Sequence, residues 1–172
     1  MIDRHLLPAQ RALLAPPARM LVRLGVTADQ ATLAGFVLGL SAFVALTAGA
    51  FGTALLLVLA NRLADGLDGA IAREVGSTDR GAFLDIALDF AFYALVPLGF
   101  ALADPAANSL AAAVLVASFV GTGSSFLAFA SVAAKRGLQT ADYPTKGIYY
   151  LGGLTEGAET IGLFVAMCLW PA

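Results

Sequence analysis

The sequence predicts an all-α integral membrane protein, a helical bundle of five spanning helices preceded by an amphipathic surface helix. Of its 172 residues, 59% are hydrophobic and 13% are charged, and the mean hydropathy is +0.83. A soluble domain is about half apolar and a quarter charged. Residues 30–61 also form one uncharged stretch, which is longer than the roughly 20 residues that a single span requires. The net charge of −2 gives no indication of a nucleic-acid partner.

Residues 1–24 are predicted to form an amphipathic juxtamembrane helix, and residues 25–172 the transmembrane domain. Leucines and arginines are interspersed throughout the first segment. This pattern is typical of a helix that lies on a membrane surface, and it excludes a cleavable signal peptide. A plain anchor without substrate contact is the simplest interpretation. Thr27 and Gln30 have the spacing of a capping box that opens the first span.

Turn residues and charges divide the transmembrane domain into five predicted spans. Gly49–Thr53 has the composition of a tight turn and splits the long uncharged stretch in two. The third span contains Pro97, and a proline inside a helix can kink it. The predicted spans cover residues 31–49, 53–73, 80–103, 107–134 and 147–170.

The basic residues predict how these spans are oriented. Every lysine and arginine except Arg62 falls on one side, in the N-terminal segment or at the connections 74–80 and 135–146. The connections on the other side carry a single charge, Asp104. The positive-inside rule therefore predicts a multi-pass inner-membrane protein whose N-terminus is cytoplasmic. Arg62 lies midway along the second span.

Four aspartates are the candidate functional residues. Asp65 and Asp68 are three residues apart on the second span, and Asp85 and Asp89 are four apart on the third, so each pair shares one helix face. The short connection predicts that these helices are antiparallel neighbours whose acids face each other at one depth. Small residues on both helix faces predict a close approach with room for a ligand. Carboxylates at membrane depth are costly unless they are paired, bind metal or face water.

The ligand types predict a hard divalent cation, Mg²⁺ or Mn²⁺, because no histidine or cysteine lies near the acids in the sequence. Four carboxylates could hold two such ions, which can clamp phosphate oxygens during an in-line displacement. Arg73 adds a planar fork suited to phosphate. In the alternative interpretation the acids are neutralised structurally by Arg62, Arg73 and Arg80. Transfer at a phosphorus centre is the favoured chemistry.

The motif resembles the signature of the CDP-alcohol phosphatidyltransferase family at every defined position. The matching residues are Asp65, Asp68, Gly69, Ala72, Arg73, Gly81, Asp85 and Asp89. The resemblance implies an enzyme that displaces CMP from a CDP-linked lipid or alcohol by an acceptor hydroxyl. The spacer between Arg73 and Gly81 is one residue shorter than the family's usual spacing. The family usually has six spans where five are visible here, so a last helix is expected to be missing, through truncation or in a shorter relative.

The resemblance also implies roles for the individual residues. Asp65, Asp68 and Asp85 would ligate metal, and Asp89 would lie at the metal site and act as the base for the acceptor hydroxyl. The CDP site would be shaped by a set that overlaps the metal ligands: Asp68, Gly69, Ala72, Arg73 and Gly81. The active site would be cytoplasmic and the protein a homodimer. Which CDP-linked compound is the donor is left open, although CDP-diacylglycerol fits an active site that borders the bilayer.

The acceptor is left open by the sequence. Glycerol phosphate, inositol phosphate, serine and other polyols, polyol phosphates or amino alcohols are all compatible. Thr155, Glu156 and Glu159 lie within the fifth predicted span and could bind an acceptor, or the glutamates could pair with an arginine. Lys135, Arg136 and Lys146 would suit an acceptor phosphate, although the positive-inside rule explains them equally well.

Two other function classes are compatible with the motif. A divalent cation transporter would use the acids as an ion path and would show ion flux without affinity for CDP. A catalytically silent membrane protein would bind CDP and metal without turnover. The acids cluster towards one end of the spans, whereas a transporter site is typically at the midplane. This position favours the transferase.

Overall fold

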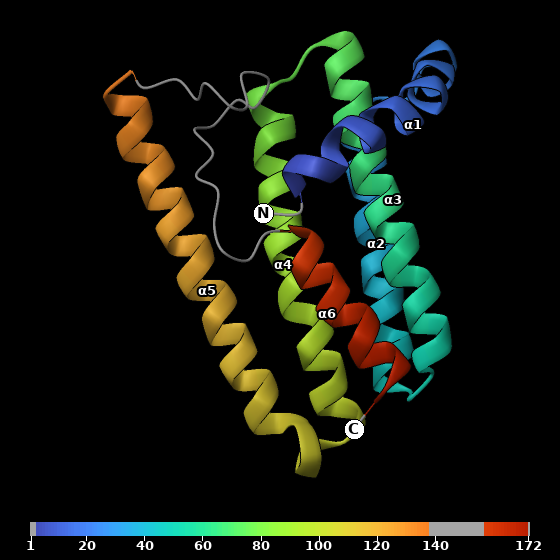
Figure 1. Ribbon diagram of the computed structural model, residues 1–172, viewed down its shortest axis with the longest axis vertical. Coiled ribbons are helices and arrows are strands. Elements are labelled where there is room, and N and C mark those ends of the chain that lie inside the picture. The colour runs from blue at the N-terminus through green and yellow to red at the C-terminus, as the bar shows by residue number, and fades with distance from the viewer. Residues whose placement is uncertain (1–2, 138–156, 172) are drawn as a thin grey trace.

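The computed structural model describes residues 3–137 and 157–171, and within these ranges it contains six α-helices and no strand. Figure 1 shows them as an elongated bundle. This architecture confirms the predicted all-α membrane fold. The helices are α1 (Asp3–Arg23), α2 (Ala28–Thr47), α3 (Phe51–Val75), α4 (Asp79–Ala103), α5 (Pro105–Lys135) and α6 (Gly157–Leu169).

The capping box predicted at the first span is present. The backbone N–H of Gln30 donates to the Thr27 hydroxyl (3.2 Å), and the backbone N–H of Thr27 donates to the side-chain oxygen of Gln30 (3.0 Å). Because the helix starts directly after this cap, α2 begins at Ala28, earlier than expected. Gly49, with φ of +70°, makes the turn into α3. The predicted start of the last span, residues 147–156, lies outside the described residues.

Among the described helices, three (α2, α4 and α5) are long and apolar enough to cross a membrane. Helix α3 has the same length as α4, 25 residues, and each carries two of the candidate aspartates, but α3 also carries Arg62 in its middle and Arg73 and Glu74 in its last turn. An apolar cluster holds α2, α3, α4 and α6 together through Leu46, Val58, Phe92 and Phe164, which are almost fully buried. The polar residues Asn61, Arg62 and Asp68 of α3 are therefore largely enclosed within an apolar bundle.

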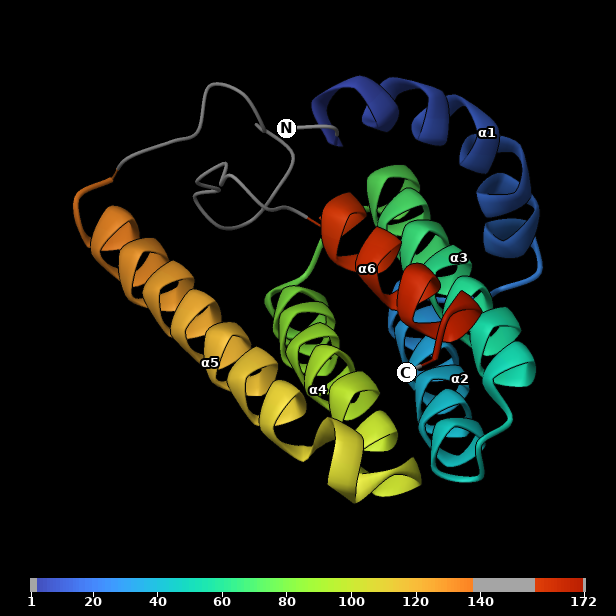
Figure 2. The same ribbon diagram turned by 60° about the horizontal axis from the view of Figure 1, so that its bottom comes forward.

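Helix α2 is the element that positions the two acid-bearing helices. As predicted, α3 and α4 run in opposite directions (Figure 1). The prediction that they approach each other closely was wrong, because the most extensive contacts of both helices are with α2. Figure 2 shows α2 lying between them. A short connection can join two helices that are held apart by a third.

Glycines on α2 and α4 allow this packing. A Cβ on Gly35 would lie 3.1 Å from the Ala64 Cβ of α3, and one on Gly39 would lie 2.8 Å from the Phe92 ring of α4. On α4, Gly99 faces Leu46 of α2 with a corresponding distance of 2.7 Å. Small residues let membrane helices approach closely. The glycines that allow the close packing thus lie on both α2 and α4.

Helix α1 lies across the end of the bundle where α3 meets α4 (Figure 2). Its buried residues Leu14 and Ala18 pack against Ala70 and Ile71 of α3. Leu13 and Met20 are 75% and 64% exposed. One face of α1 is therefore docked on α3 while exposed apolar side chains remain, as expected for a helix that rests on a membrane surface.

Candidate active site

All four candidate aspartates line one narrow pocket between α2, α3 and α4. The pocket has an open volume of about 10 Å³, roughly that of one water-sized sphere. Its walls contain ten residues: Thr32, Gly35, Phe36, Asn61, Arg62, Asp65, Asp68, Asp85, Leu88 and Asp89. The sequence prediction that the two acidic pairs face a common space is therefore correct, even though α3 and α4 are not closely packed.

Three of the carboxylates converge. One oxygen from each of Asp65, Asp68 and Asp85 lies within 4.8 Å of the other two. Asp68 is only 5% exposed, and among the described residues no hydrogen-bond partner reaches its Oδ2 atom. A buried polar atom without a partner is costly. This arrangement therefore calls for a ligand that carries positive charge or donates hydrogen bonds.

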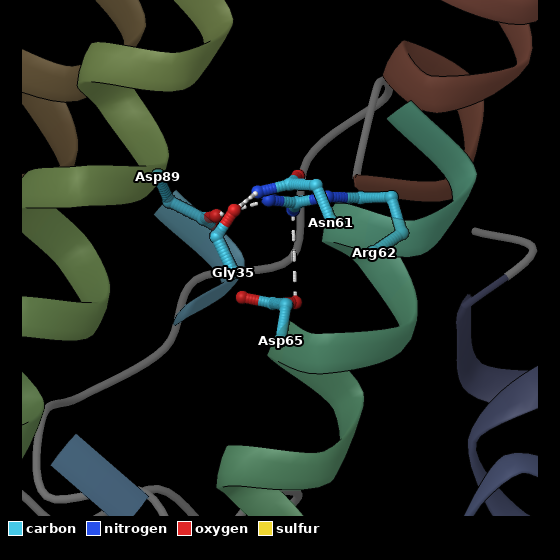
Figure 3. A network of polar contacts seen from close by, with 5 residues as sticks. All are labelled: Gly35, Asn61, Arg62, Asp65 and Asp89. Atoms are coloured by element: carbon cyan, nitrogen blue, oxygen red, sulfur yellow. Dashed lines mark hydrogen bonds and ion pairs between the residues drawn. The ribbon is translucent and has the colours of Figure 1, made fainter. Parts of the chain in front are cut away.

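The fourth carboxylate is held differently. Asp89 Oδ1 accepts a hydrogen bond of 2.7 Å from an Arg62 guanidinium nitrogen, and Asp65 Oδ2 lies 3.6 Å from another nitrogen of the same group. Arg62 thus bridges an acid of α3 and an acid of α4 (Figure 3). In the alternative interpretation, arginines neutralise the aspartates structurally. Arg62 does so, whereas Arg80 pairs instead with Asp29, at 3.2 Å.

Further contacts fix Arg62 in place. Its Nε donates to Asn61 Oδ1 (2.7 Å), and Asn61 Nδ2 donates to the Gly35 carbonyl of α2 (2.8 Å). The guanidinium carbon lies 4.7 Å from the centroid of the Phe92 ring and 5.6 Å from that of Tyr93. A planar cation on an aromatic face is stabilised electrostatically. The side chain is therefore restrained by α2, α3 and α4 together.

The other motif residues lie towards the α3–α4 connection. Arg73 is exposed in the last turn of α3, and a Cβ on Gly69 would lie 3.4 Å from its guanidinium. Gly81, in the first turn of α4, donates its amide to the Thr78 cap at 3.0 Å. A Cβ at this position would lie 3.3 Å from Asp29 Oδ1. Ala72 is in the same turn of α3 as Arg73 and is half-buried.

Sequence reasoning missed the contribution of α2 and of Asn61. Thr32 and Gly35 line the pocket from α2, and buried Asn61 links that helix to Arg62. Two signals were available. Gly35 and Gly39 have the spacing of a helix-packing motif, and Asn61 is a polar residue deep within an apolar run.

The structure describes only some of the residues that the sequence suggested as acceptor contacts. Glu159 is half-buried in the first turn of α6, which packs against α3. Lys135 and Arg136 are at the end of α5. Thr155, Glu156 and Lys146 lie outside the described residues.

A larger cavity of about 650 Å³ lies between α4 and α5. Its walls include Phe83, Phe90 and Phe119, and it holds none of the predicted site residues. The α4 residues that line this cavity lie on the opposite face of the helix from Asp85 and Asp89. We therefore place the functional site in the smaller acidic pocket.

The fold and the pocket together define the class of protein. It is an all-α membrane protein with an acid-lined site between its helices. The family model for CDP-alcohol phosphatidyltransferase matches residues 25–171, and the chain belongs to this family. A match over this range confirms the resemblance seen in the motif. Family membership supports phosphatidyl transfer in phospholipid synthesis.

A curated relative agrees with the membrane assignment. The chain is 55% identical to the inner membrane protein YnjF of Escherichia coli strain K12, over 172 residues that cover 100% of this chain and 84% of the relative. No solved structure matches the chain.

Proposed function

We propose that the chain is a metal-dependent phosphatidyltransferase that displaces CMP from CDP-diacylglycerol by an acceptor hydroxyl. The observations that carry this proposal are the convergence of the Asp65, Asp68 and Asp85 carboxylates and the buried, unpartnered Oδ2 atom of Asp68. An oxygen-only ligand set suits Mg²⁺ or Mn²⁺. Asp65, Asp68 and Asp85 would hold the cation, with Asp89 at the edge of the same site. A cation bound there would neutralise charge on the donor's pyrophosphate oxygens.

The remaining motif residues would bind the donor and move the proton. Arg73 would pair with phosphate oxygens through its fork, and Gly69, Ala72 and Gly81 would leave room for the nucleotide. Asp89 would take the proton of the acceptor hydroxyl, whose oxygen then bonds to the phosphatidyl phosphorus as the bond to CMP breaks. Because Arg62 contacts Asp89 Oδ1, we assign this base role to Asp89 Oδ2.

The donor, the acceptor and the assembly are proposed from the surroundings of the pocket, its charges and the family resemblance. A lipid donor fits a pocket enclosed by apolar helices. The acceptor would be a polyol, polyol phosphate or amino alcohol, with Glu156 and Glu159 as candidate contacts. The positive-inside distribution places the N-terminus and the pocket on the cytoplasmic side. Homodimerisation stays a prediction from the family resemblance.

The test is CMP release by the purified protein with CDP-diacylglycerol, Mg²⁺ or Mn²⁺, and a panel of acceptors. Asp89→Asn should lower turnover by about 10²–10⁴-fold, the usual contribution of a general base. Asp104→Asn is the matched control, because Asp104 caps α5 away from the pocket and asparagine caps equally well. Retained turnover in Asp89→Asn would refute the role of this residue.

The same preparation separates the alternatives. Divalent cation flux into vesicles without CMP release would favour a transporter. Binding of CDP and metal without turnover for any acceptor would favour a silent binding protein.

A further inference from the structure

The ion pairs of Arg62 bear on how many cations the pocket holds. Four carboxylates led to the expectation of two ions. The structure divides the acids, however, into three that converge and one, Asp89, that is bonded to a guanidinium. Asp65 belongs to both groups, since it also lies within ion-pair distance of Arg62.

We propose that the Arg62 guanidinium takes the place of a second divalent cation, so that the nucleotide-free protein binds a single ion at Asp65, Asp68 and Asp85. This inference rests on the metal site of the proposed function and makes Arg62 a positioning residue. A cation that bridged Asp65 and Asp89 would be left with only the second oxygen of each acid, because Arg62 already contacts Asp65 Oδ2 and Asp89 Oδ1. Its positive charge would also be repelled by the guanidinium.

Arg62 is held too firmly to leave this position at low cost. Its three nitrogen groups contact Asn61, Asp65 and Asp89, and its plane lies near two aromatic rings. The side chain is only 15% exposed. Moving it would break several contacts at once and would leave a buried cation unpaired, which is strongly unfavourable. The open volume of the pocket, about 10 Å³, also matches one small occupant.

The experiment is a count of Mn²⁺ bound per chain, by electron paramagnetic resonance of free Mn²⁺, in detergent and without nucleotide. Wild type should bind one ion. Arg62→Met, which keeps the length of the side chain but removes its charge, should bind two and hold the first at least about tenfold more tightly. Arg80→Met is the control, because Arg80 pairs with Asp29 outside the pocket, and it should bind one ion.

A charge-neutral double variant covers the case in which Arg62→Met does not fold. Arg62→Met combined with Asp89→Asn removes both partners of the pair, which buried sites tolerate better than the loss of one. It should bind one Mn²⁺ with an affinity within about threefold of wild type. A loss of tenfold or more would identify Asp89 as a ligand and overturn the proposal.

The outcomes distinguish this inference from the proposed function. Two ions of similar affinity in wild type, or a single ion in folded Arg62→Met, would overturn the role of Arg62 and leave the metal site standing. No Mn²⁺ binding to wild type would overturn both.

Discussion

Asp89 and Asp68 show how the same side chain can lie in two different environments within one pocket. Asp68 is buried with an unpartnered oxygen, whereas Asp89 is partly exposed and bonded to Arg62. The first environment favours a bound cation. In the second, one carboxylate oxygen is occupied and the other can receive a proton, which suits a base.

Arg73 gives the sharpest residue-level prediction outside the acids. Arg73→Lys keeps the charge but loses the planar fork that binds two phosphate oxygens. We expect the KM for the CDP donor to rise about tenfold, equivalent to roughly 1.4 kcal/mol, with a smaller change in kcat. Arg136→Lys, at the end of α5, is the control in the same CMP-release assay. An unchanged KM would remove Arg73 from the donor site.

That the four aspartates line one pocket could be predicted because they belong to a dense local motif. Arg62 was one of the arginines expected to neutralise the acids, but its pairing with Asp89 in particular could not be predicted. Arg62 is 27 positions away in the sequence, and its choice of acid depends on how α3 and α4 are set against α2. Local spacing contains no information on that arrangement.

At the scale of elements, the helices were predictable and their packing was only partly so. Apolar runs predicted the first four spans to within a few residues, and the Thr27 cap and the Gly49 turn predicted two of the ends. The expectation that α3 and α4 pack closely came from their short connection. It failed because α2 offers both helices a better surface, made of glycines that admit neighbouring side chains.

Gly39 tests this role of α2. A methyl group there would lie 2.8 Å from the buried Phe92 ring and 3.3 Å from Asn61 Nδ2. We expect Gly39→Ala to destabilise the bundle by about 1–3 kcal/mol through overpacking and to lower turnover by disturbing Asn61. Thermal melting in detergent measures the first effect.

Gly121→Ala is the matched control for Gly39, since nothing lies within 4 Å of the added Cβ on α5. It should melt at or above the wild-type temperature, because alanine favours helix more than glycine does. Equal melting temperatures for wild type and Gly39→Ala would show that the close approach of α2 and α4 is not limiting.

At the scale of the whole molecule, charge asymmetry predicts the orientation in the membrane. In a Cys168→Ala background, Ser77→Cys lies in the α3–α4 connection and Ala106→Cys at the start of α5. In intact cells an impermeant maleimide should label the second and spare the first until the membrane is permeabilised. The reverse pattern would place the pocket on the outer side.

The link between the two acid-bearing helices has an evolutionary consequence. Since α2 sets the separation of α3 and α4, the length of the connection between them does not determine the distance between the acids. The number of residues in this connection can change during evolution while the carboxylates keep their positions. The shortened spacer of this chain is therefore compatible with an intact catalytic geometry, and tolerance to insertions should be greatest at this turn.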